Sequence, residues 1–170
     1  MSKPKSSFYA DLMRGKAGEQ KFFELYGDYL EALDGREGDF QILFTDIKVE
    51  LKSDSYDPNK WGNLVLERWS SPGKPGGPHQ ALKHGCKYFA YYFINHDLLF
   101  LFETHRLVKR IEMLEKRGKV KLEDRANMGY TTQYYRIPRK DLEDLMLHWH
   151  TEIERKYKLG RKNYEKGQKK

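Results

Sequence analysis

Residues 39–52 contain two short runs in which apolar and polar side chains alternate, and this pattern constrains the fold more than any other part of the chain. Side chains alternate between the two faces of a β-strand, so each run presents one apolar face. A two-residue turn at residues 44–45 or 45–46 pairs these faces in a hairpin, whereas a slip of one residue would turn half of them to water. The apolar positions are Phe40, Ile42 and Phe44 in the first run and Ile47, Val49 and Leu51 in the second.

The same register gathers charged side chains on the other face of the hairpin. Asp39 falls on the same face as Glu50 and Lys52, directly opposite one of them. Two carboxylates suit a divalent cation, and a lysine beside them can stabilise charge on a phosphate, so the hairpin predicts metal-dependent hydrolysis of a phosphodiester. A half-buried hairpin with a charged, solvated face is the alternative. Asp46 is a competing acid, but it falls in or next to the turn, so the pattern favours Asp39.

Glu19 lies in a segment with the apolar spacing of a helix, and it falls on the apolar stripe rather than opposite it. A carboxylate that faces the core needs a partner, and a cation held by Asp39 and Glu50 would supply one. For Glu19 alone, a position near the helix start that the helix dipole favours is the alternative explanation. The stripe comprises Phe22, Phe23, Tyr26, Leu30 and Leu33.

A helix that bears Glu19, then Asp39 at the start of a hairpin, then Glu50 and Lys52 as Glu-x-Lys, resembles the PD-(D/E)XK nuclease superfamily. This superfamily includes restriction endonucleases, archaeal Holliday-junction resolvases and phage endonucleases. The resemblance covers about residues 15–105, and Gly38 stands where the family has a proline. It implies an α/β fold with a restriction-endonuclease-like core, in which helices flank a central mixed β-sheet, followed by a C-terminal helix and a basic tail.

The resemblance also implies an activity, that of a Mg²⁺-dependent deoxyribonuclease of the phage or junction-resolvase type, in which Mn²⁺ can replace Mg²⁺. Glu19, Asp39, Glu50 and Lys52 would be the catalytic residues; the three acids would hold the metal, and Lys52 would orient water or stabilise the transition state. The partner would be duplex or branched DNA, and coordinated cutting of both strands would argue for a homodimer. Two alternatives stay open: an inactive nuclease-fold protein that binds nucleic acid in a larger assembly, and a chain whose basic tail recognises an acidic protein or RNA.

The net charge of +7 lies entirely in the last part of the sequence. Residues 155–170 contain eight basic residues and one acid, Glu165, so residues 1–154 sum to zero. We expect residues 1–154 to form a single nuclease domain and residues 155–170 to be a flexible tail, either solvated or a phosphate-binding arm. The candidate phosphate contacts are Arg155, Lys156, Lys158, Arg161 and Lys162 in the tail, and Lys74 and Lys83 on the loop and helix after the site.

The remaining pattern predicts further elements of an α/β domain. The expected strands are residues 63–69, 87–94 and 98–102, with an edge strand at 134–137; the expected helices are residues 79–86, 104–114 and 141–153, and residues 70–78 form a loop. The one cysteine, Cys86, excludes an intramolecular disulfide. No apolar run reaches membrane-spanning length and no signal core follows the basic start, so we expect a cytoplasmic protein, in the host cytoplasm if it is phage-encoded.

Overall fold

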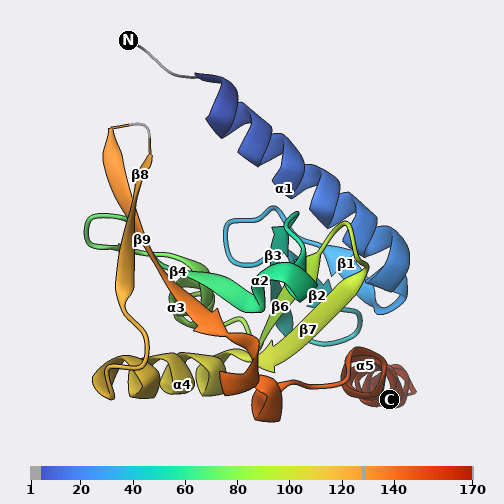
Figure 1. Cartoon of the computed structure of the whole chain (residues 1–170). Helices are drawn as coiled ribbons and strands as arrows, with labels where there is room; N and C mark the ends of the chain where they lie inside the picture. The colour runs from blue at the N-terminus through green and yellow to red at the C-terminus, as the bar shows by residue number, and fades with distance from the viewer. Residues whose placement is uncertain (1–4, 128, 170) are drawn as a thin grey trace.

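The strands of the computed structural model, which describes residues 5–127 and 129–169, form two β-sheets (Figure 1). The larger sheet has the strand order β1-β2-β3-β6-β7 and is mixed, because β3 and β6 run parallel whereas its other neighbours are antiparallel. Helices flank this sheet, so the predicted α/β fold with a central mixed sheet is confirmed. Its strands are β1 (Leu30–Ala32), β2 (Phe40–Ile42), β3 (Lys48–Asp54), β6 (Tyr88–Phe93) and β7 (Leu98–Glu103), and the helices are α1 (Lys5–Tyr26), α2 (Pro58–Trp61), α3 (Gly77–Lys83), α4 (Thr104–Lys116) and α5 (Trp149–Gly167).

The predicted hairpin is present with the predicted register. Phe40 pairs with Val49, and the N–H of Ile42 donates to the carbonyl of Ile47 over 2.9 Å. Residues 43–46 lie between these two residues, with Phe44 at a φ of 61° and the N–H of Thr45 donating to the carbonyl of Ile42 over 3.1 Å, so the connection is longer than the predicted two-residue turn although the register is the same. The apolar face packs against α1 and α5 in a core cluster that includes Phe22.

The second sheet has the order β5-β4-β9-β8 and is antiparallel. The sequence predicts residues 134–137 as an edge strand, but this prediction is wrong, because β9 lies between β4 and β8. The polar sequence of β8 lacks the apolar alternation that marks a strand, so its pairing with β9 could not be seen in advance. The strands are β4 (Asn63–Ser71), β5 (Lys74–Pro75), β8 (Leu122–Asn127) and β9 (Tyr130–Pro138).

The helical stripe predicted around Glu19 ends earlier than expected. α1 stops at Tyr26, and Leu30 belongs to β1, where it pairs with Ile42. Within residues 15–26 of α1, the part whose side chains the structure describes, Gly18 and Phe22 are buried, and Gly18 lies so close to Ser53 that a side chain there would collide with it. Glu19 itself is exposed, so the expectation that its carboxylate faces the core is wrong.

The last helix also differs from its predicted bounds, since α5 begins at Trp149 and runs to Gly167, through most of the segment expected to be a tail. Residues 139–145 form two short 3₁₀ turns instead. Trp149 and Ile153, in the first turns of α5, are buried in the core. Further along the helix, Gly160 packs against the backbone of Phe44. None of the helices within residues 5–127 and 129–169 is long and apolar enough to span a membrane.

Candidate functional site

Asp39 is fixed where the pairing of β2 with β3 stops. Its N–H donates to the carbonyl of Val49 over 3.1 Å, and its Oδ2 accepts the N–H of Leu51 at 2.7 Å. The paired positions of β2 and β3 reach only to Val49, so the carboxylate of Asp39 satisfies a strand N–H that has no backbone partner there. This hydrogen bond holds Asp39 beside Glu50.

Glu50 and Lys52 occupy alternate positions of β3 and therefore share a face. Val49, which precedes Glu50 on β3, is fully buried, whereas Glu50 is half-buried and Lys52 is exposed. The structure thus places Asp39 beside Glu50, as the register predicts, with Lys52 two residues further along the same face of β3, where its charge acts on Glu67. Asp46 is exposed at the turn, away from this group.

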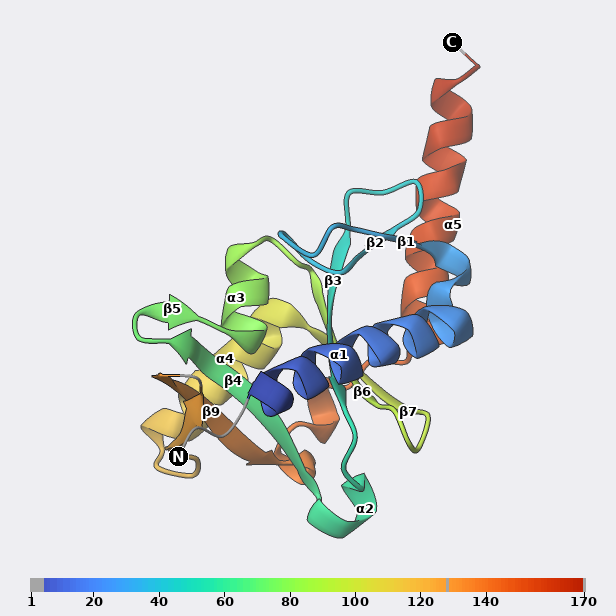
Figure 2. The ribbon, with the colours of Figure 1, turned by 90° about the horizontal axis from the view of Figure 1, so that it is seen from above.

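Glu19 reaches the same region from α1, which crosses over β3 (Figure 2). Glu19 and Asp39 line one open hollow, with Lys16 and Phe23 on the helix side and Phe40 on the strand side. All of the predicted acids are therefore near each other, although Glu19 approaches from the surface rather than from the core.

The three carboxylates disturb one another electrostatically. Burial raises the pKa of Glu50 to about 8, and the charges of Asp39 and Glu19 act in the same direction. Burial also raises the pKa of Asp39 to about 6, with the Leu51 N–H opposing the rise and Glu19 adding to it. The pKa of Glu19 is raised by partial desolvation, which Lys16 counteracts.

These residues fit a divalent cation. Among the side chains that the structure describes, no lysine, arginine or histidine forms an ion pair with Asp39 or Glu50, so two half-buried carboxylates lie side by side without a counter-charge. The described residues contain no cluster of three or more His, Cys, Asp or Glu side chains poised around one metal position. Mg²⁺ is commonly held by one or two carboxylates, with water and phosphate oxygens as its other ligands, so the Asp39–Glu50 pair meets its needs.

Glu67 is a further acid near this site: the family resemblance includes a glutamate on the strand that follows Glu-x-Lys, but Glu67 was not among the predicted catalytic residues. It lies on β4, where a bulge interrupts the pairing between Glu67 and Trp69. Burial raises its pKa and the charge of Lys52 lowers it, so the two side chains lie within electrostatic reach. Gly76 and Gly77 pack directly on Glu67, because a Cβ at either position would collide with its side chain or backbone. The sequence pattern predicts a loop over residues 70–78, but this prediction is wrong, because the segment contains β5 and Gly77 is the first residue of α3.

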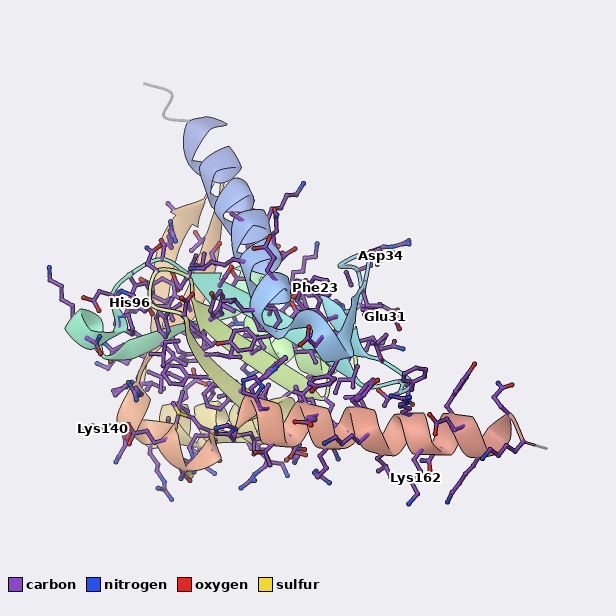
Figure 3. The ribbon with its side chains drawn as sticks, turned by 90° about the vertical axis from the view of Figure 1, so that its right-hand side faces the viewer. Phe23, Glu31, Asp34, His96, Lys140 and Lys162 are labelled. Carbon is purple, nitrogen blue, oxygen red and sulfur yellow. The ribbon has the colours of Figure 1, made fainter. Side chains whose placement is uncertain are left out.

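The predicted phosphate contacts do not gather at this site. Lys74 is exposed on β5, and Lys83 is exposed at the end of α3. The basic part of α5 lies against the turn of the hairpin, where Tyr164 contacts Phe44 with ring centroids 5.3 Å apart. The turn follows the last residue of β2, whereas Asp39 precedes its first residue, so the basic part of α5 and Asp39 lie at opposite ends of this strand. The described ion pairs within α5 join Arg155 and Lys156 to Glu152, Lys158 to Glu154, and Arg161 to Glu165, and Lys162 points away from the body (Figure 3).

Comparisons with known proteins add little to this geometry. No protein-family profile and no curated protein matches the chain. The structure of D212, a nuclease from a fusselovirus, is similar over 91% of this chain and 91% of its own, with 14% sequence identity and a TM-score of 0.40. Likeness of this degree does not assign a chemistry, so the function has to rest on the side chains.

Proposed function

We propose that the protein is a metal-dependent endonuclease that hydrolyses DNA phosphodiester bonds. The observation that carries this proposal is the pair Asp39 and Glu50, two adjacent half-buried carboxylates whose pKa values are raised by burial and by the charges of neighbouring acids, with no described cation to offset them. Keeping such a pair costs stability unless a cation binds it. Lys52 stands next on the same face, where a phosphate bound at the pair would lie.

Each residue has a distinct part in this proposal. Asp39 and Glu50 would hold Mg²⁺ or Mn²⁺, with Glu19 as a further ligand or as an acid that positions water. When bound, the metal would supply a water of lowered pKa and would neutralise charge on the scissile phosphate. Lys52 is a compact cation that donates hydrogen bonds to an oxygen of the phosphate as its charge grows in the transition state. The hydrogen bond from the Leu51 N–H would keep the Asp39 carboxylate oriented to bind the metal.

DNA would be held mainly through its phosphates. Lys74 and Lys83 follow the site along the chain, and the basic face of α5 would extend the contact surface beyond the hairpin turn. A phage-type or junction-resolvase-like enzyme, as the resemblance implies, would use such contacts to place either duplex or branched DNA across the β3 edge.

The direct test is incubation of the purified protein with supercoiled, linear, single-stranded and branched DNA in Mg²⁺, in Mn²⁺ or in EDTA. We expect cleavage in either metal and none in EDTA, and we expect Glu50→Gln to remove it. Glu31, an exposed acid on neighbouring β1, provides the matched control Glu31→Gln, which should cut normally. Cleavage that persists in EDTA or in Glu50→Gln would refute the proposal.

A second candidate is a nuclease-fold protein that binds nucleic acid without cutting it. One observation favours it: within the described residues no cluster of three metal-ligating side chains is preassembled. The same experiment separates the two candidates, because a binding protein would retard branched or duplex DNA in every metal condition and leave it intact.

A further inference from the structure

The exposed face of the second sheet continues the candidate site away from α1. Side chains alternate along β4 and β9, so Leu66 and Tyr135 are buried in the core while Glu67 and Tyr134 face outwards. Lys52 meets this outward face from β3, and the elements together line an open hollow of about 360 Å³. Lys52 therefore belongs both to the candidate site and to this hollow, which we call the β3–β9 hollow.

The lining of the β3–β9 hollow has the chemistry of a nucleotide site. Arg125 on β8 and Arg136 on β9 bring two guanidinium groups, which suit the oxygens of a phosphate. Tyr134 brings an aromatic ring, which can stack on any base, and Val65 adds an apolar surface beside it. Cationic, aromatic and apolar groups thus meet next to Lys52.

Two acids in the hollow do not prevent an anion from binding. Asp54 keeps its charge but is held by the hydroxyl of Tyr91, which donates to it over 2.6 Å, and the positive charge of Lys52 acts on Glu67. The sheet order puts Arg125 on the outer strand β8, with β9 between it and the strand of Glu67. The acids therefore lie toward β3 and β4, and phosphate can be held at the arginine side.

The size of the hollow restricts what can enter. Its volume lies at the low end of the range of about 300–1,000 Å³ for ligand pockets, which suits one nucleotide. A nucleotide within a duplex is held by its partner, and it reaches such a hollow only after it leaves the base stack. A hollow of this size would therefore admit a nucleotide of an unpaired strand more readily than one within a duplex.

We infer that the β3–β9 hollow binds one unpaired nucleotide of the DNA strand next to the scissile phosphate, with its base on Tyr134 and its phosphate at Arg125 and Arg136. This inference rests on the proposed nuclease function and adds a substrate preference to it. DNA with a frayed or forked end should bind better than blunt duplex of the same sequence.

The experiment measures binding of fluorescein-labelled forked and blunt DNA by anisotropy in EDTA, where no cleavage interferes. The intact chain should prefer the fork, and Tyr134→Ala should weaken fork binding by roughly tenfold or more, as expected for loss of one stacked base. Tyr134→Phe keeps the ring and should retain the preference. Tyr130→Ala is the matched control, because Tyr130 is an exposed tyrosine on the same strand that does not line the hollow.

A second pair of variants tests the phosphate contact independently. Arg136 is paired with Glu123 at 3.2 Å, and Glu123 does not line the hollow. Arg136→Gln should weaken fork binding, whereas Glu123→Gln breaks the same ion pair and should leave fork binding unchanged or tighter. Equal losses in both variants would mean that the ion pair only supports the fold, and the inference would be wrong.

The outcomes also separate this inference from the nuclease proposal. If the protein cleaves DNA with no preference for forks, or with a preference that survives Tyr134→Ala and Arg136→Gln, the inference about the hollow is wrong. The nuclease proposal then still holds. A fork preference that depends on Tyr134, in a protein that cuts no DNA in either metal, would support the hollow and overturn the nuclease.

Discussion

The carboxylate of Asp39 accepts the N–H of Leu51 at 2.7 Å, at the point where β2 stops pairing with β3. One side chain thus has two separable properties, a hydrogen-bond acceptor for the strand and a negative charge beside Glu50. Substitutions can remove either of them.

Asp39→Asn keeps an oxygen that can accept the Leu51 N–H but removes the charge. We expect it to abolish metal-dependent cleavage with little loss of stability. Asp39→Ala removes both properties, so it should be inactive and also less stable by about 1–3 kcal/mol, the scale for leaving a buried donor unpaired. Nicking assays and thermal melts measure the two effects. Asp46→Ala is the control, and its inactivity alongside an active Asp39 variant would show that the wrong acid was assigned.

Lys52→Ala should lower the rate of cleavage by about 10²-fold or more, since one donor to the transition state is removed. Lys48→Ala is the matched control, because Lys48 lies on the same face of β3 but pairs with Glu37 at 3.0 Å. Single-turnover rates at saturating DNA measure the chemical step. Weaker DNA binding with an unchanged rate would instead identify Lys52 as a phosphate anchor.

The stability of the metal-free protein should fall as pH rises. The folded-state pKa of Glu50, about 8, lies above its ordinary value of 4.5, so the folded state binds the proton more tightly than the unfolded state does. The resulting stabilisation is complete below about pH 4.5 and is lost as pH rises through 8. Glu50→Gln cannot ionise, so in EDTA its advantage over the native chain should grow from near zero at pH 4.5 to roughly 1–4 kcal/mol above pH 8.

Thermal melts in EDTA from pH 4 to 9 measure this difference. Glu31→Gln is the control, and its melting curve should follow that of the native chain at every pH. A stability gain of Glu50→Gln that stays constant across the range would contradict the prediction, because it would then come from packing rather than from charge.

Truncating α5 would disturb its packing on Phe44, so the DNA-binding role of its basic residues is better tested by substitution. Glutamine at Arg155, Lys158, Arg161 and Lys162 keeps the helix and removes four charges. If these residues bind phosphates, the slope of log affinity against log salt should flatten by about 0.9 for each duplex phosphate that the variant no longer binds, or roughly 2–4 in total. The cleavage rate at saturating DNA should not change. An unchanged slope would show that this part of α5 is solvated.

The hairpin could be predicted because its side-chain period of two permits only one register that buries Phe40 and Val49 together. That register also brings Asp39 to Glu50, so this part of the site follows from local sequence. The outward position of Glu19 could not be predicted, because Leu30 continues the helical spacing of Phe22 yet pairs with Ile42 in β1.

The second sheet depends on pairing between distant residues, and sequence alternation does not reveal it. The alternation at residues 63–69 predicts a strand, but it does not say that Leu64 will pair with Ile137 rather than join the central sheet. Glu67 and the β3–β9 hollow exist only because of that pairing. The sequence resemblance indicates a glutamate on this strand, but the position of Glu67 near Lys52 and the hollow itself could not be predicted.

The packing of Gly76 and Gly77 on Glu67 has a consequence for the evolution of this protein. At Gly77 a Cβ would collide with the backbone of residue 67, and its φ of 49° also favours glycine, whereas at Gly76 a Cβ would meet only the movable side chain of Glu67. In a relative with this fold, glycine at position 77 should therefore persist whichever residue occupies position 67. Glycine at position 76 should be replaceable where a smaller side chain stands in place of Glu67.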